Sequence, residues 1–383
     1  MKKILAIFGT RPEAIKMAPL IKELQKHPEQ LSCKVAVTAQ HREMLDQVLQ
    51  LFDIKPDYDL DIMHAGQTLF DITRRVLSGL EKVLENENPD LVLVHGDTST
   101  TSTAALASFY RQVPVGHVEA GLRTGNKYSP FPEEINRRIT GVLADLHFAP
   151  TREAADNLRK ESVPSEKVFI TGNTVIDALL ATVHEEYRFQ DPVLGNIDYT
   201  NKRILLVTTH RRENLGQPLR QVYRALCTLA DEYPDIEIVF PVHKNPAVRE
   251  LAHEELGDLK CVHMIEPMDY EPFVNLMGRC HMVLTDSGGL QEEAPSLGKP
   301  VLVLRDTTER PEAVGAGTVK LVGTARERIE EEARRLLGDK NHYRKMANSV
   351  NPYGDGKASA RIRRAIQFYF GQTPQRPGDY LVV

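Results

Sequence analysis

The sequence predicts an α/β protein with two Rossmann-like, doubly wound domains that face a cleft. Short runs rich in Val, Ile and Leu alternate with amphipathic helical patterns almost from end to end. These runs are apolar at nearly every position, which indicates parallel strands covered by helices on both faces of a sheet. The pattern starts again after Thr171-Gly172-Asn173, and 383 residues are too many for one core of ordinary size.

Residues 1–171 are expected to form the first domain. Its first apolar run follows two lysines, as in a secretion signal, but Arg11 soon follows the run, and a first strand fits better. The predicted strands are Ile4–Phe8, Lys34–Thr38, Leu91–His95, Val115–Val118 and Leu146–Ala149. The predicted helices are Glu13–Lys26, Arg42–Phe52, Leu69–Glu85, Thr101–Arg111 and Glu134–Val142.

Residues 172–358 are expected to form the second domain, with the same alternation of strands and helices. After it, residues 359–383 are expected to return to the first domain as the helix Ser359–Phe370 and to end in a frayed tail rich in Pro and Gly. The predicted strands of the second domain are Ile204–Thr208, Glu237–Phe240, Val262–Ile265, Met282–Leu284, Val301–Leu304 and Val319–Val322.

Composition excludes several classes of partner. The chain has 48 Lys and Arg against 53 Asp and Glu, and a net charge of −5 argues against nucleic acid or an anionic membrane. No apolar run approaches the roughly 20 residues of a membrane span. The cysteines form no CxxC pair and are interpreted as reduced thiols of a cytoplasmic protein. They are Cys33, Cys227, Cys261 and Cys280.

A glycine-rich turn between two apolar runs is the most informative segment. Ser287-Gly288-Gly289 stands where a helix is expected to begin. Glycine lets the backbone approach a ligand closely, and the N–H groups at a helix start suit a phosphate. Glu292 and Glu293 follow on the helix, and Arg310 lies beyond the next strand. These residues indicate a nucleotide-sugar site; the alternative is an ordinary strand–helix turn in which glycine only relieves crowding.

Polar residues directly after predicted strands are further candidates, because ligands of an open parallel sheet bind beyond the carboxyl ends of its strands. Each of them alone fits a polar turn that caps a strand, but their number favours a site. They are Gly9–Glu13 with Lys16, His95–Asp97, Glu119–Arg123, His210–Glu213 and His243–Pro246.

The charges of these candidates indicate the type of reaction. Carboxylates gathered in one site suit general acid/base work and stabilise a developing oxocarbenium ion. Cations and N–H groups suit a leaving diphosphate. Together they indicate cleavage or rearrangement at an anomeric carbon. The carboxylates are Asp97, Glu119 and Glu133, and the groups for the diphosphate are Arg11, Lys16, His210 and the helix after Gly288.

Neither a metal nor a cofactor is expected. No GxGxxG follows a predicted strand, so the nicotinamide fingerprint is missing, and no cluster of His, Cys and Asp has zinc spacing. The segment Asp57–Asp61 contains the DxD pattern of some metal-dependent glycosyltransferases. It follows Pro56 rather than an apolar run, so a solvated loop is the preferred interpretation.

Six long segments are distinctive: HGDTSTTSTAALASFY, GHVEAGLRTGNKYSPFPEEINRR, HRRENLG, PVHKNP, TDSGGLQEEAPSLGKPVLVLRDTTERPEA and NPYGDG. From Lys3 to about Phe370 the chain resembles the non-hydrolysing UDP-N-acetylglucosamine 2-epimerase family. The resemblance implies a glycosyltransferase-B-like fold, usually a homodimer, that interconverts UDP-N-acetylglucosamine (UDP-GlcNAc) and UDP-N-acetylmannosamine (UDP-ManNAc). It implies anti elimination of UDP to 2-acetamidoglucal and re-addition of UDP with inversion at C2, without metal or nicotinamide. The product then feeds surface polysaccharides.

The resemblance also assigns residues to roles. Its implied catalytic residues are Asp97, Glu119, Glu133 and His210. Its implied nucleotide-sugar contacts are Arg11, Lys16, Phe273, Ser287, Gly288, Gly289, Glu293 and Arg310. Met268 stands where some members have Gln beside the uracil. Gln40, His41 and His243 match a site where some members hold a second UDP-GlcNAc as an activator, although Glu43 replaces a Gln and Gly66 an Arg there.

Three alternatives stay open at this point. The hydrolysing relative shares the first half-reaction but releases ManNAc and UDP. A retaining glycosyltransferase of the same fold needs fewer carboxylates, and a nucleotide-sugar sensor would leave the carboxylates unexplained. Incubation with UDP-GlcNAc alone separates these alternatives from the epimerase. The epimerase gives the epimer, the hydrolysing relative gives a free sugar, the glycosyltransferase gives nothing without an acceptor, and the sensor gives nothing at all.

Overall fold

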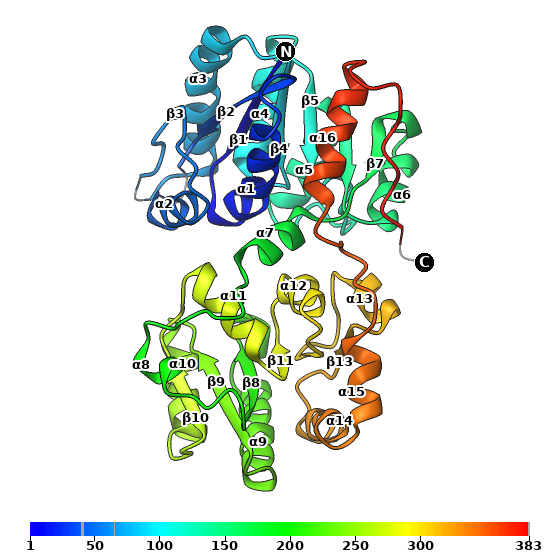
Figure 1. Cartoon of the computed structure of the whole chain (residues 1–383). Coiled ribbons are helices and arrows are strands. Elements are labelled where there is room, and N and C mark those ends of the chain that lie inside the picture. The colour runs from blue at the N-terminus through cyan, green and yellow to red at the C-terminus, as the bar shows by residue number, and fades with distance from the viewer. Residues whose placement is uncertain (40–41, 65, 382–383) are drawn as a thin grey trace. The chain divides into compact units, whose positions relative to one another are not determined.

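The computed structural model describes residues 1–39, 42–64 and 66–381. It divides into two compact units, Met1–Ala181 with Tyr353–Leu381, and Thr182–Pro352 (Figure 1). The sequence places these boundaries at residues 171 and 358 instead. The helix that follows residue 171 therefore belongs to the first unit.

Hydrogen bonds explain where the first unit ends. Helix α7 (Thr174–Thr182) carries Asp177, which accepts from the backbone N–H groups of Ala358 at 3.1 Å and Ser359 at 2.8 Å. The Asn173 N–H donates to the Tyr353 carbonyl at 2.6 Å. These contacts tie α7 to the returning end of the chain, and the sequence does not indicate that these residues meet.

The first unit contains a parallel seven-stranded sheet in the order β3-β2-β1-β4-β5-β6-β7. Five of its strands overlap the predicted ones. The two short strands β3 and β7 were not predicted, because two or three residues are too few to give an apolar run. The strands are β1 Lys2–Phe8, β2 Leu31–Val37, β3 Tyr58–Asp59, β4 Leu91–His95, β5 Val115–Val118, β6 Leu146–Ala149 and β7 Val168–Ile170.

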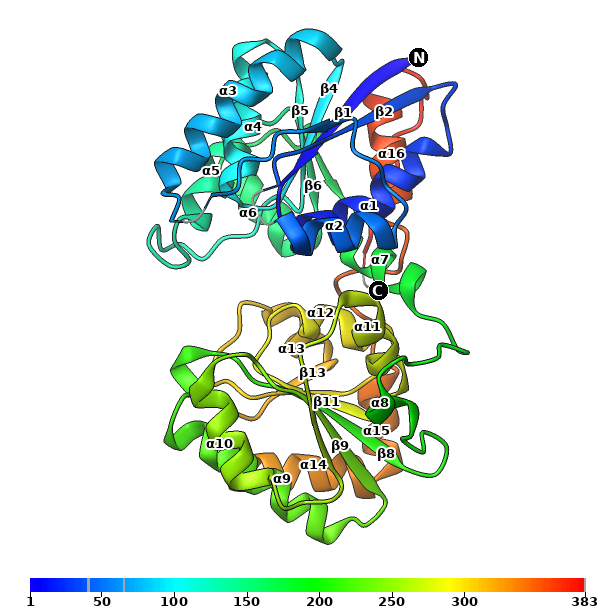
Figure 2. The ribbon, with the colours of Figure 1, turned by 90° about the vertical axis from the view of Figure 1, so that its left-hand side faces the viewer.

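Helices cover both faces of this sheet. α1, α2 and α16 lie on one face, and α3, α4 and α5 lie on the other (Figure 2). α16 packs against α1, where Arg363 Nε donates to Glu23 at 2.9 Å. The helices are α1 Arg11–Gln25, α2 Arg42–Leu51, α3 Leu69–Glu87, α4 Ser99–Tyr110, α5 Glu133–Leu143, α6 Arg152–Lys160 and α16 Ala358–Tyr369.

Short polar caps start α1 and α4 directly after their strands. The Thr10 N–H donates to Glu13 at 2.8 Å, and the Glu13 N–H faces Thr10 Oγ1 at 3.5 Å, which is a capping box. The Thr101 N–H donates to Thr98 Oγ1 at 3.1 Å at the start of α4. Because these caps satisfy N–H groups that a helix start leaves unpaired, the turn containing Asp97 is fixed at the carboxyl edge of the sheet.

The second unit contains a parallel six-stranded sheet in the Rossmann order, β10-β9-β8-β11-β12-β13. All six strands overlap predicted ones, so the predicted α/β class with two parallel sheets is confirmed. The strands are β8 Arg203–Thr208, β9 Ile236–Pro241, β10 Val262–Ile265, β11 Met282–Thr285, β12 Val301–Val303 and β13 Val319–Leu321. The helices are α8 Pro192–Gly195, α9 Gln217–Glu232, α10 Pro246–Leu256, α11 Tyr270–Arg279, α12 Leu290–Ser296, α13 Pro311–Ala316, α14 Arg326–Gly338 and α15 Lys340–Ala347.

Within the described ranges of the chain, every helix is too short or too polar to cross a bilayer.

Candidate functional site

Glu119 is a carboxylate of the first unit whose backbone and side chain are both held in place. It follows β5 directly, its φ of +62° lies in a region that non-glycine residues seldom adopt, and its side chain is 8% exposed. Its Oε2 forms an ion pair with Lys16, from which it is separated by 103 positions, and accepts from Asn173 Nδ2 at 2.7 Å. The structure thus brings two predicted site residues, Lys16 and Glu119, together, and it adds Asn173, which was not predicted.

Asp97 lies in the turn between β4 and α4 and forms an ion pair with Arg137 of α5. Asn136 fixes the same turn by donating from Nδ2 to the Asp97 carbonyl at 2.9 Å. Neither Arg137 nor Asn136 was predicted as a site residue, although both lie in one of the distinctive segments.

Glu133 is the first residue of α5, one turn before Arg137, and its Oε2 is buried. In the described part of the chain this oxygen has no hydrogen-bond partner. The neighbouring Glu134 does have partners. Its Oε2 lies 3.2 Å from Arg137 Nη1 and accepts from the Thr124 N–H at 3.0 Å. A buried carboxylate oxygen without a partner is costly.

Glu13 joins two of the turns at the carboxyl edge. It is buried, and burial raises its pKa despite its hydrogen bonds. It accepts from the Gly9 N–H at 3.0 Å on the turn after β1 and from Thr98 Oγ1 at 2.7 Å on the turn after β4. The turn that leads to Arg11 and the turn that contains Asp97 are therefore held together by one side chain. Glu13 is among the polar residues predicted to follow the first strand, but the sequence does not indicate that its side chain joins two turns.

His210 and Asp286 form a closely contacting pair in the second unit. His210 Nδ1 lies 2.8 Å from Asp286 Oδ1, and the His210 and Arg211 N–H groups each donate to Asp286 Oδ2 at 2.9 Å. Burial alone would raise the pKa of Asp286, but the His210 and Arg211 hydrogen bonds outweigh it, so that the pKa is lowered. Because Nδ1 is held by the carboxylate, Nε2 is the ring nitrogen left for a ligand.

Asp286 was not predicted as a site residue, although it directly follows a buried strand and opens the glycine-rich turn. In this turn, the Ser287 N–H donates to Thr285 Oγ1 at 2.9 Å, and α12 begins at Leu290. A Cβ added at Gly288 would meet only Arg211, at 4.0 Å, so the turn has space beside it. Arg310, beyond β12, forms an ion pair with Glu292 of α12.

The remaining predicted residues lie as follows. Arg11 begins α1 and Glu293 lies on α12, both half-buried, and Phe273 is half-buried on α11. His243 follows β9, with its ring 6.1 Å from that of His210. Gln40 and His41 are outside the described residues.

The acids of the DxD segment bind cations of the protein itself. Asp57 accepts from Lys34 Nζ at 2.6 Å, and Arg42 donates to Asp59 at 2.6 Å and to Asp61 at 2.8 Å. Over the described ranges, no group of three or more His, Cys, Asp or Glu side chains is arranged to hold a metal ion.

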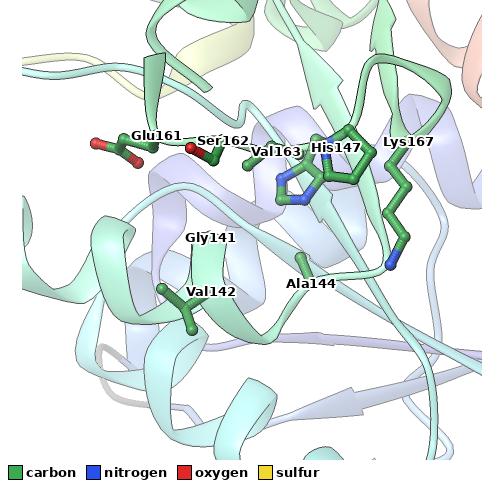
Figure 3. Close-up of a pocket in the computed structure, with 9 residues that line it drawn as sticks. Gly141, Val142, Ala144, His147, Glu161, Ser162, Val163 and Lys167 are labelled. Atoms are coloured by element: carbon green, nitrogen blue, oxygen red, sulfur yellow. The ribbon is translucent and has the colours of Figure 1, made fainter. Parts of the chain in front are cut away.

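One pocket of about 270 Å³ lies elsewhere in the first unit (Figure 3). It is lined by residues at the end of α5, by His147 near the start of β6 and by the segment around Ser162. Its charged residues already have partners, since Lys167 lies 3.7 Å from Asp145 and Glu161 accepts from Arg123. It is at the amino end of the strands, opposite the edge where the candidate residues lie.

The chain is similar to known proteins over almost its whole length. The family model of UDP-N-acetylglucosamine 2-epimerase matches residues 22–367. A Bacillus subtilis UDP-N-acetylglucosamine 2-epimerase is 55% identical over 378 residues, which are 99% of this chain and 98% of that protein. The Escherichia coli K12 protein of the same name is 56% identical over 370 residues, which are 95% of this chain and 98% of that one. The solved structure of the Neisseria meningitidis UDP-GlcNAc 2-epimerase bound to UDP-GlcNAc is 55% identical and has a TM-score of 0.84, covering 95% of this chain and 99% of that chain.

Proposed function

Because the chain belongs to the UDP-N-acetylglucosamine 2-epimerase family, it is an isomerase of the nucleotide sugar UDP-GlcNAc, and we propose that it produces UDP-ManNAc without releasing the sugar. Its two parallel α/β sheets are those of the glycosyltransferase-B-like fold of its relatives. The relative crystallised with UDP-GlcNAc supports the same ligand for this chain.

The proposed reaction begins at C1. The hydrogen at C2 is not next to a carbonyl, so its direct removal from the intact sugar is difficult. Cleavage of the bond between C1 and the diphosphate oxygen places positive charge on C1, which acidifies C2–H. A carboxylate takes this proton to give 2-acetamidoglucal and UDP. Addition of UDP back to C1, with protonation of C2 on the opposite face, completes the inversion and leaves no net proton change.

The observation that carries this proposal is the difference among the three carboxylates of the first unit. Asp97 is paired with Arg137, and Glu119 is held by Lys16 and Asn173, whereas Glu133 has a buried oxygen without a partner in the described structure. Two held carboxylates and one unpartnered carboxylate suit a reaction that removes a proton with one group and returns it with another.

The groups proposed to hold the leaving UDP are cationic or carry N–H donors. His210 presents Nε2 while Asp286 fixes its other ring nitrogen at 2.8 Å. Lys16 and Arg11 supply positive charge at the start of α1, and the turn at Gly288 has space for a diphosphate oxygen. Charge-assisted contacts of this kind stabilise a leaving diphosphate more than a neutral sugar.

Incubation with UDP-GlcNAc alone, followed by chromatography of the products, tests the proposal. We expect UDP-ManNAc and UDP-GlcNAc at equilibrium. Free ManNAc with UDP would instead establish the hydrolysing reaction. Turnover only after addition of an acceptor would establish a glycosyltransferase, and tight binding without turnover would establish a sensor.

We also propose a cytoplasmic homodimer whose product feeds surface polysaccharides. Exposed apolar side chains on two adjacent helices support the dimer. Phe109 and Tyr110 at the end of α4 are 58% and 63% exposed, and Ile139 and Val142 on α5 are 44% and 86% exposed. Side chains of this size are stabilised when a second copy covers them.

A further inference from the structure

His95 is a buried histidine whose two ring nitrogens have no partner. It ends β4, is 3% exposed, and within the described residues neither Nδ1 nor Nε2 makes a hydrogen bond. By comparison, His117 on the neighbouring β5 places Nε2 2.7 Å from the Gly96 carbonyl. An unpaired buried donor is costly, so a hydrogen bond formed when the substrate binds would remove this cost.

The nearest charged group is Glu119. His95 Nε2 lies 3.9 Å from Glu119 Oε1, which is too far for a hydrogen bond but within reach of a small side-chain movement. Gly96 lies beside this gap, and a Cβ there would stand 3.7 Å from Oε1. Burial lowers the pKa of His95 to about 4, with Glu119 and Asp97 opposing the change and Lys16 adding to it. The ring is therefore neutral near pH 7 and carries one N–H.

Lys16 cannot form a close ion pair with Glu119 and with the diphosphate equally well. In this structure it pairs with Glu119 Oε2, and the proposed function requires it to contact the diphosphate. A carboxylate that is 8% exposed is strongly destabilised when it loses its cation and gains no donor. Asn173 supplies one donor to Oε2 at 2.7 Å, and His95 faces the other carboxylate oxygen, Oε1.

We propose that His95 is a positioning residue that donates from Nε2–H to Glu119 Oε1 when Lys16 turns to the diphosphate. This inference rests on the proposed function, because it needs a substrate that draws Lys16 away. Glu119 then accepts from two neutral donors, His95 and Asn173. It stays oriented for proton transfer at C2 while the positive charge of Lys16 moves to the leaving group.

Two substitutions at His95 test the donor directly. His95→Leu removes it, and His95→Gln keeps an N–H near the position of Nε2. We expect His95→Leu to lower kcat by about 10–100-fold, as loss of a supporting hydrogen bond commonly does, with little change in KM, and His95→Gln to recover most of the loss. A His95→Gln enzyme as slow as His95→Leu, or a loss confined to KM, would overturn the inference.

His147 provides the matched control. It is 1% exposed, and burial lowers its pKa to about 4, as for His95, but it lies at the amino end of the strands. His147→Leu should lower the melting temperature to a similar extent without the loss of kcat. An equal loss of kcat in both leucine variants would mean that any buried histidine has this effect, which also overturns the inference.

A spectroscopic signature covers the case in which His95→Leu does not fold. In wild-type protein labelled with ¹⁵N-histidine, the resonance missing from His95→Gln identifies His95. Saturation with UDP should move its Nε2–H proton downfield, as a new hydrogen bond requires. A resonance that does not move, or an Nε2 without a proton, overturns the inference. Absence of UDP-ManNAc in the wild-type assay would contradict the proposed function alone, and the UDP titration would still decide for His95.

Discussion

The three carboxylates of the first unit have different neighbours, and their removal should affect chemistry more than binding. Asp97→Asn, Glu119→Gln and Glu133→Gln should each lower kcat by about 10²–10⁴-fold, the usual range for general acid/base groups. Arg310→Ala should instead raise KM. Steady-state kinetics with UDP-GlcNAc measures both effects. Near-normal kcat with raised KM in all three carboxylate variants would mean that these groups only bind the substrate.

Buried histidines should make the fold sensitive to mild acid. Burial lowers the pKa of His95 and His147 to about 4 and that of His117 to about 3, whereas an unfolded chain binds these protons near pH 6.5. The free energy of unfolding should therefore be highest, as far as these histidines determine it, above about pH 6.5. It should decrease as the pH falls toward 4, because the unfolded state binds more protons. The loss is about 1.4 kcal/mol per histidine for each pH unit in this window.

Urea unfolding at pH 7.5, 6.5 and 5.5 measures this decrease. His117→Gln removes one of the contributing groups and should give a shallower decrease than the wild-type chain. Equal free energies of unfolding at all three pH values in the wild-type chain would show that these histidines titrate alike in both states.

At the scale of elements, the acids beside β3 should be dispensable for catalysis. Arg42 and Lys34 hold these acids at 2.6–2.8 Å, so they serve the packing of β2, β3 and α2. Asp59→Asn should leave kcat within about twofold, as surface changes usually do, and EDTA should leave wild-type turnover unchanged. Activity that is lost in EDTA and restored by magnesium would contradict this prediction and revive the DxD motif as a metal site.

Elements with long apolar runs could be predicted from the sequence, and side-chain partnerships could not. Ten of the eleven predicted strands keep their positions within two residues, because most of them are buried on both faces, which dictates an apolar run. β3 and β7 are too short to give that signal. Asp286 reaches His210 across 76 positions, Asn173 reaches Glu119 across 54, and Arg137 reaches Asp97 across 40. Only the folded sheet brings these pairs together.

At the scale of the whole molecule, the exposed apolar residues of α4 and α5 should govern assembly. Val142→Asp places a charge where the proposed partner copy would lie, so it should shift a dimer toward monomer in analytical ultracentrifugation. Val350→Asp is the matched control, because Val350 is 56% exposed in the second unit and far in sequence from α4 and α5. A wild-type chain that sediments as a monomer, or a dimer that Val142→Asp leaves intact, would contradict this placement of the interface.

The fate of the hydrogen at C2 tests the central claim most directly. Elimination and re-addition pass through a carboxylate that can exchange its proton with solvent, so UDP-ManNAc formed in D₂O should carry deuterium at C2. Proton NMR of the reaction should show this loss of the C2–H signal, with traces of 2-acetamidoglucal and UDP at long incubation and without free ManNAc. UDP-ManNAc that keeps its original C2 hydrogen completely, with no detectable 2-acetamidoglucal, would contradict the proposed mechanism.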